Sequence, residues 1–213
     1  MSTIPTTPTR PQLDSQALFN IPNQLTSLRL MLSIVLFVTI PLGYYLASTI
    51  LFCVAAGTDW LDGYYARKYG QVTTLGRILD PFVDKIIICG TFIMLCAVPN
   101  SLVIPGLPGL PGSGIESWMA VVVMGRELLV TTLRSFLEGE GRDFSAQWSG
   151  KIKMGFQCMA VIWSLVALQY QPSELPEWIA RGLPIAAWLA VISTVYSGVI
   201  YVFAAIKILS EKK

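Results

Sequence analysis

Six apolar segments, each long enough to cross a bilayer as a helix, constrain the fold of this chain more than any other feature of its sequence. They lie near residues 25–45, 47–65, 78–98, 115–137, 148–170 and 179–208, and a helix needs about 20 apolar residues to span the hydrocarbon core of a membrane. Of the 213 residues, 54% are hydrophobic and only 13% are charged. We therefore predict an all-α polytopic membrane protein with six transmembrane helices in one domain, residues 20–213.

Basic residues indicate how these helices are oriented. They occur in the N-terminal tail, in the loops of one side and at the helix ends beside them: Arg10, Arg29, Arg67, Lys68, Arg77, Lys85, Arg134, Arg142, Lys151, Lys153, Lys207, Lys212 and Lys213. Only Arg181 lies on the other side. By the positive-inside rule the first side is cytoplasmic, and six spans place both termini there.

The ends and the net charge of the chain add two further expectations. Residues 1–19 are rich in Thr, Pro and Ser and lack the apolar core of a signal peptide, so we expect a flexible cytoplasmic tail. The net charge of +2 is too small to indicate a nucleic-acid partner.

Four aspartates interrupt the second and third apolar segments. Asp59 and Asp62 are three residues apart and Asp80 and Asp84 are four apart, so on helices the members of each pair project from one face. An ionised aspartate at the centre of a membrane helix costs roughly 3 kcal/mol, so these side chains must face a wet cavity, a metal ion or one another. The stretch they define opens onto the predicted cytoplasmic side.

The types of ligand available narrow the chemistry of this acidic site. The chain has no histidine, which excludes imidazole from metal binding and leaves carboxylates as the general bases. Carboxylate oxygens suit hard cations such as Mg²⁺ or Mn²⁺. Two such ions would orient a diphosphate and offset its charge, an arrangement used for displacement at phosphorus.

The same stretch carries a family signature. All eight of its fixed positions match that of the CDP-alcohol phosphotransferases, which the chain resembles: Asp59-x2-Asp62-Gly63-x2-Ala66-Arg67-x8-Gly76-x3-Asp80-x3-Asp84. Residues 20–29, together with Arg126, Glu127 and Arg134, resemble the bacterial branch of that family that makes phosphatidylglycerophosphate. These outer matches are less specific than the signature.

The resemblance implies a reaction and a set of site residues. It implies transfer of the phosphatidyl group of CDP-diacylglycerol to glycerol 3-phosphate, with release of CMP, by a homodimer in the bacterial cytoplasmic (inner) membrane. The implied ligands of two Mg²⁺ or Mn²⁺ ions are Asp59, Asp62, Asp80 and Asp84, and Asp84 also takes the proton of the acceptor hydroxyl. The implied contacts to CDP-diacylglycerol are Asn23, Thr26, Gly63, Arg67 and Thr73.

Charged residues in the fourth and fifth segments are candidates for binding the phosphate of the acceptor: Arg126, Arg134 and Lys151. Arg134 is eight residues after Arg126 and so lies near the same helix face, and a cationic cluster facing a cavity beside bound metals suits a phosphorylated acceptor. A plainer alternative is that Arg126 pairs with Glu127 and that Lys151 and Lys153 are ordinary positive-inside anchors.

Other functions remain open at this stage. Within the family, a cardiolipin synthase would take phosphatidylglycerol, and phosphatidylinositol phosphate or phosphatidylserine synthases would take other polar acceptors. A cation transporter also carries intramembrane aspartates, but we would expect inverted repeats, and no repeat is visible. A prenyltransferase binds diphosphate through two separate Asp-rich motifs, whereas the acids here form one cluster. Release of CMP from a CDP-lipid would separate a family synthase from the last two.

Overall fold

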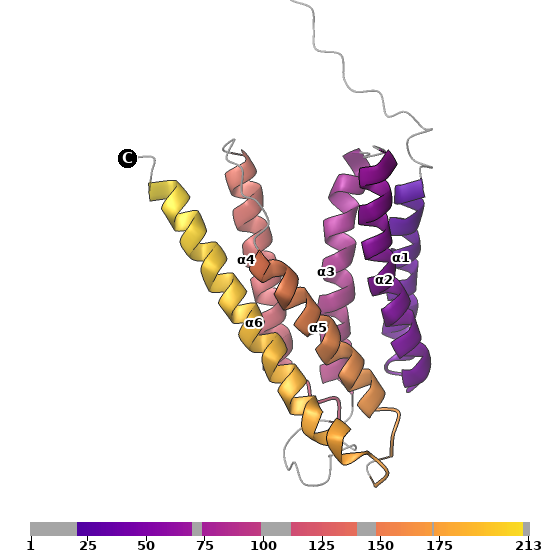
Figure 1. Cartoon of the computed structure of the whole chain (residues 1–213). Coiled ribbons are helices and arrows are strands. Elements are labelled where there is room, and N and C mark those ends of the chain that lie inside the picture. The colour runs from indigo at the N-terminus through magenta and orange to yellow at the C-terminus, as the bar shows by residue number, and fades with distance from the viewer. Residues whose placement is uncertain (1–20, 70–73, 99–111, 140–147, 172, 211–213) are drawn as a thin grey trace, which may run out of the picture.

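The computed structural model describes residues 21–69, 74–98, 112–139, 148–171 and 173–210, and within helices it leaves the side chains of 21–23, 59–69, 74–80 and 148 outside that description. Over these residues the chain forms helices and no strand, so the predicted all-α class with six helices is confirmed. The helices are α1 (Ile21–Thr39), α2 (Tyr45–Tyr69), α3 (Thr74–Cys96), α4 (Ser117–Gly139), α5 (Trp148–Ala167) and α6 (Glu177–Ser210) (Figure 1). The predicted tail, 1–19, lies outside the described residues.

The helix bounds differ from the predicted ones by a few residues, except at the end of α1. We expected the first helix to reach residue 45, and this bound is wrong because α1 ends at Thr39. Pro41 disfavours a continuing helix, and Gly43 takes a left-handed conformation with φ of 80°, as is common just after a helix. The turn residues are themselves apolar, so hydropathy alone did not reveal the break.

Two helices occupy the centre of the arrangement. α3 packs against α1, α4 and α5, while α5 packs against α2, α3 and α6, and α4 also contacts α6. Figure 1 shows α4 and α6 diverging from α1, α2 and α3 toward the top of the view. The C-terminal ends of α2, α4 and α6 lie at this open end, as do the N-terminal ends of α1 and α3.

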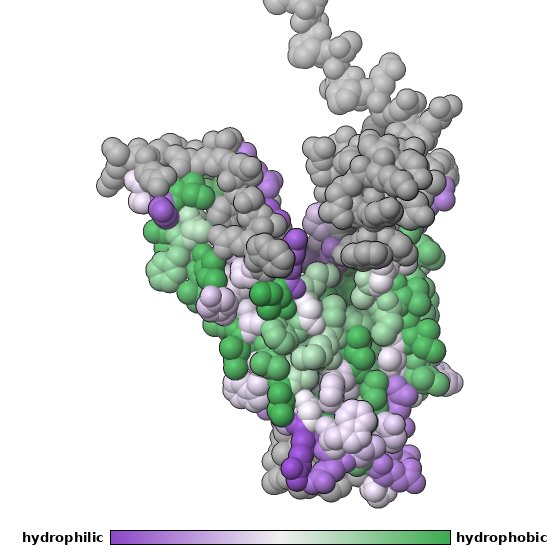
Figure 2. Space-filling model, in the orientation of Figure 1, coloured by the Kyte–Doolittle hydropathy of each residue, from purple (hydrophilic) through white to green (hydrophobic). Residues whose placement is uncertain are grey.

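All six helices contribute to one apolar core. Its fully buried side chains include one from each helix in turn: Leu36, Phe52, Phe92, Val123, Leu165 and Ala190. The outward faces are also apolar, since Met31, Val121 and Phe203 are largely exposed, and hydrophobic side chains cover the flank of the molecule in Figure 2. Exposed apolar surface of this extent is unusual for a monomer in water.

Length and apolarity can be judged helix by helix within the described residues. There α6 alone is long and apolar enough to cross a membrane by these criteria. Gln24–Thr39 and Tyr45–Thr58 are shorter apolar stretches in α1 and α2.

Gly114 offers a test of the connection that leads into α4. Its φ is 67°, and a Cβ there would lie 2.5 Å from Cγ of Leu183. We expect Gly114→Ala to lower the free energy of unfolding by about 1–3 kcal/mol because both the backbone and the contact become strained. Thermal unfolding of the detergent-solubilised protein measures this change.

The matched control is Gly155→Ala on α5, where no neighbouring atom lies within 4 Å of the added Cβ. This substitution should leave stability unchanged or raise it, because alanine favours the helix. Equal losses for the two variants would show that the close contact at Gly114 does not limit the fold.

Candidate active site

The four aspartates of the signature lie on two helices. Asp59 and Asp62 are in α2, and Asp80 and Asp84 are in α3. The helical backbone therefore gives each pair the one-face spacing that we predicted. The side chains of Asp59, Asp62 and Asp80 lie outside the described residues, so how closely the two pairs approach stays a prediction.

Asp84 is the signature aspartate whose side chain is described, and it forms an ion pair with Arg29 of α1. Nη2 of Arg29 donates to Oδ1 of Asp84. The Arg29 side chain is 2% exposed and that of Asp84 is 30% exposed. Removing either partner of such a pair leaves an uncompensated charge, so the pair fixes α1 against α3 and orients the Asp84 carboxylate.

Arg29 is a residue whose place at the site the sequence reasoning missed. We counted it among the basic residues of the cytoplasmic side and within the family-like stretch 20–29, but gave it no role at the site. Its position five residues inside an apolar segment was the available signal, because a charge there needs a partner. Thr26 lies one turn before it on α1 and is fully buried. Of the other predicted nucleotide contacts, Thr73 and the side chains of Asn23, Gly63 and Arg67 lie outside the described residues.

A divalent cation at this site would depend on carboxylate ligands. Within the described side chains, no three His, Cys, Asp or Glu residues come close enough together to hold a metal ion. The chemistry of the donor set nevertheless fits Mg²⁺ or Mn²⁺, because Asp84 supplies oxygen ligands at a half-exposed position and the chain has no histidine.

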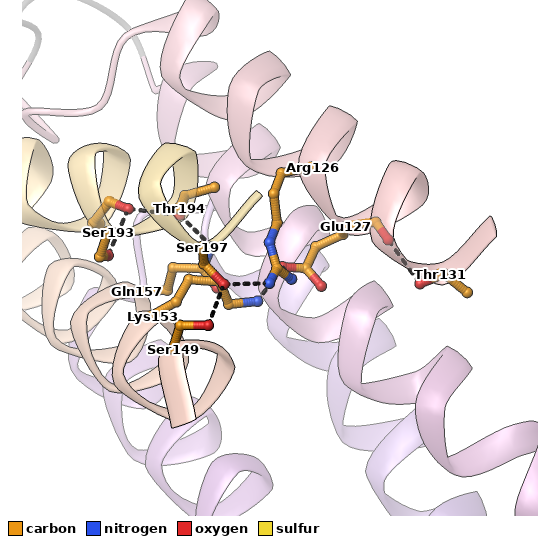
Figure 3. A network of polar contacts seen from close by, with 10 residues as sticks. Arg126, Glu127, Thr131, Ser149, Lys153, Gln157, Ser193, Thr194 and Ser197 are labelled. Carbon is orange, nitrogen blue, oxygen red and sulfur yellow. Dashed lines mark hydrogen bonds and ion pairs between the residues drawn. The ribbon is translucent and has the colours of Figure 1, made fainter. Parts of the chain in front are cut away.

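A second polar cluster joins α4, α5 and α6 (Figure 3). Glu127 of α4 accepts hydrogen bonds from Nη1 of Arg126 at 3.2 Å and from Nζ of Lys153 on α5. Nη2 of Arg126 also donates to Oγ of Ser197 on α6 at 2.6 Å, and the guanidinium lies 5.3 Å from the ring centre of Tyr201. Glu127 and Lys153 are only 8% and 6% exposed. One buried carboxylate thus serves two cations, and a positive charge is left over.

This cluster bears on both interpretations of the charged residues in the fourth and fifth segments. Arg126 does pair with Glu127, as the plainer alternative held, but Lys153 is a buried member of the cluster and not a surface anchor. Lys151 is exposed on α5. Arg134 is half-buried, and its Nε has no hydrogen-bonding partner among the described residues. Binding of an acceptor phosphate by Arg126, Arg134 and Lys151 stays a prediction.

An apolar groove of about 350 Å³ runs between α4 and α6 beside Arg126. Its lining includes Val122, Leu129, Val195, Val199 and Phe203. The aliphatic stem of Arg126 closes one part of it, packed over Gly198, where a Cβ would lie 3.2 Å from Cγ of Arg126. Because the lining is apolar apart from this arginine, the groove suits a hydrocarbon chain and not a phosphorylated ligand.

The chain is similar in sequence to the members of one known protein family. The sequence profile of the CDP-alcohol phosphatidyltransferase family matches residues 19–204. A CDP-diacylglycerol–glycerol-3-phosphate 3-phosphatidyltransferase of Bacillus subtilis (strain 168) is 35% identical over 197 residues, which covers 85% of this chain and 92% of the relative. The Escherichia coli (strain K12) protein of the same name is 31% identical over 196 residues, covering 88% of this chain and 95% of the relative.

The shared carboxylate of the α4–α5–α6 cluster can be tested by substitution. Glu127→Gln should lower the free energy of unfolding by about 3–5 kcal/mol, because it leaves Arg126 and Lys153 buried without a counter-charge. The control is Glu177→Gln, which breaks an exposed ion pair with Arg181 and should cost less than about 1 kcal/mol. Thermal unfolding in detergent measures both, and equal stabilities of the two variants would contradict a structural role for Glu127.

Proposed function

Because the chain belongs to the CDP-alcohol phosphatidyltransferase family, we propose that it transfers the phosphatidyl group of CDP-diacylglycerol to sn-glycerol 3-phosphate, giving phosphatidylglycerophosphate and CMP. Bacterial relatives that align over more than nine tenths of their own length are named for a transfer to glycerol 3-phosphate. The reaction belongs to phospholipid biosynthesis.

One structural observation carries the choice of a phosphorylated acceptor. The buried cluster of α4 and α5 holds two cations, Arg126 and Lys153, against the single carboxylate of Glu127. Excess positive charge in a poorly solvated position is unfavourable unless an anion matches it. A phosphate monoester supplies that anion, whereas serine or an unphosphorylated polyol does not. Arg126, Arg134 and Lys151 are the residues that the sequence assigns to this phosphate.

Asp84 is the proposed general base. It would accept the proton of the acceptor hydroxyl while the oxygen attacks the phosphorus that carries the diacylglycerol. The bond from that phosphorus to the oxygen bridging it to CMP then breaks, and CMP leaves with the electron pair. Arg29 holds the Asp84 carboxylate in one orientation, so the base is positioned before the acceptor arrives.

The donor would bind where α1, α2 and α3 meet. Thr26 on the Arg29 face of α1 is the described member of the predicted nucleotide contacts. The others are Asn23, Gly63, Arg67 and Thr73. In this assignment Gly63 admits the cytidine close to the α2 backbone, and Arg67 offsets phosphate charge.

Two divalent cations, Mg²⁺ or Mn²⁺, would be held by Asp59, Asp62, Asp80 and Asp84. When bound, they offset the charge of the diphosphate and favour departure of CMP. The all-carboxylate donor set supports hard cations of this kind.

The chain is proposed to lie in the bacterial cytoplasmic membrane with six spans. The apolar outward faces of the helices support insertion, and the distribution of basic residues supports cytoplasmic termini and a cytoplasmic active site. A glycerol phosphate from the cytoplasm and a CDP-lipid from the bilayer would then meet at the open end of the helices. A homodimer is proposed from the family resemblance alone.

The direct test incubates the purified protein with CDP-diacylglycerol, Mg²⁺ and one acceptor at a time. The acceptors are glycerol 3-phosphate, phosphatidylglycerol, inositol phosphate and serine, and mass spectrometry identifies the lipid product. We expect phosphatidylglycerophosphate and CMP with glycerol 3-phosphate only. A faster reaction with any other acceptor would reassign the chain within its family, and no CMP with any of them would remove the proposal.

Asp84 and Asp80 should behave differently when each is replaced. Asp84→Asn should lower kcat by about 100-fold or more while the KM for CDP-diacylglycerol changes little, because the base is needed in the transition state. Asp80→Asn should also weaken donor binding, since it removes an anionic ligand of the cation site. Steady-state kinetics with CDP-diacylglycerol varied, on variants with unchanged unfolding midpoints, separates the two. Near-normal turnover of Asp84→Asn would exclude it as the base.

A further inference from the structure

The apolar groove between α4 and α6 opens to the outside of the helix arrangement. Leu129 of α4 and three residues of α6, Val195, Val199 and Phe203, line it and are all largely exposed. α6 packs against α4 and α5, whereas the signature aspartates belong to α2 and α3. The groove therefore lies on other helices than the proposed catalytic groups and faces the surroundings of the protein.

The lining of the groove disfavours water as its occupant. Arg126 is the only charged residue of the lining, and its guanidinium is bonded to Glu127 and Ser197, so that its aliphatic stem faces the groove over Gly198. A buried water molecule needs about two to four polar partners, which this lining does not offer. Inside a bilayer, the material available to fill an apolar groove of about 350 Å³ is hydrocarbon.

The length of the groove face and the charge at its end indicate a whole lipid. Val195, Val199 and Phe203 recur every four residues along α6, and Lys207 follows one turn later, in the last turn of the helix. The rise from Val195 to Lys207 is about 18 Å, close to the roughly 15 Å of hydrocarbon in one leaflet. Lys207 is exposed, and within the described residues it forms no ion pair.

We propose that this groove binds one acyl chain of an anionic phospholipid of the cytoplasmic leaflet, whose phosphate is held by Lys207. This lipid is neither the donor nor the acceptor of the reaction. Its chain packs on the stem of Arg126, which joins α4 to α6 through Ser197, and so stabilises the contact between these helices. Attraction to Lys207 favours an anionic headgroup over a zwitterionic one. The inference rests on the proposed membrane insertion and not on the proposed reaction.

The test adds dioleoyl phosphatidylserine or dioleoyl phosphatidylcholine to the full-length protein in detergent and measures thermal unfolding. Saturating phosphatidylserine should raise the unfolding midpoint by about 5 °C or more, and phosphatidylcholine should raise it less. Val199→Trp should lose most of the rise with either lipid, because the indole occupies the groove. Lys207→Gln should keep the smaller rise with phosphatidylcholine and lose the additional rise with phosphatidylserine.

Two matched controls separate the groove from the rest of the lipid-facing surface. Val35 of α1 is 48% exposed, as against 47% for Val199, and lies outside the groove, so Val35→Trp should keep the full rise. Arg181→Gln removes an exposed cation in the first half of α6 and should keep the preference for phosphatidylserine. Equal rises in all variants, or equal losses in Val35→Trp and Val199→Trp, would overturn the proposal.

Other occupants of the groove give different results with Val199→Trp. If the groove holds an acyl chain of the donor, this variant raises the KM for CDP-diacylglycerol. If the groove contacts a second copy of the chain, light scattering shows a change of oligomeric state. Either result, with the phosphatidylserine rise retained, would overturn the proposal. Absence of phosphatidyl transfer by the unmodified protein would remove the proposed function and leave the lipid-binding result standing.

Discussion

Ionised side chains between apolar helices must be matched by opposite charge, and in this chain that requirement fixes specific contacts between helices. Arg29, almost fully buried on α1, is matched by Asp84 of α3. Glu127 of α4 pairs with Arg126 of the same helix and with Lys153 of α5, and Arg126 also bonds Ser197 of α6. Two of these contacts join helices that are not consecutive in the chain, α1 with α3 and α4 with α6. Each ion pair holds charges that would cost several kcal/mol if one partner were removed. Apolar side chains of all six helices pack together to form the rest of the helix contacts.

This pairing of charges leaves one excess positive charge in the cluster of α4, α5 and α6, near which the acceptor is proposed to bind. Asp84 pairs with Arg29 of α1, whereas Arg126 and Lys153 share the single carboxylate of Glu127. The proposed site thus combines carboxylates of α2 and α3, suited to cations and a diphosphate, with basic residues of α4 and α5, suited to a phosphate monoester. Displacement at phosphorus needs both substrates within reach of one base, and Asp84 is the proposed base.

Much of this arrangement was predictable from sequence, and the remainder was not, for identifiable reasons. Hydropathy located all six helices because each carries a long apolar run, but it overran α1 where the turn after Thr39 is itself apolar. Helical spacing placed Asp59 with Asp62 and Asp80 with Asp84. It did not reveal that Arg29 meets Asp84 or that Lys153 meets Glu127, because periodicity gives the face of a helix and not the neighbour that covers it.

The measurement that most directly tests this account is an experimental structure of the protein with glycerol 3-phosphate bound. The account predicts that the phosphate contacts Arg126, Arg134 and Lys151, and that a hydroxyl of the same molecule points toward Asp84. A phosphate bound in the groove between α4 and α6, or at the α2 end of the acidic stretch, would contradict it.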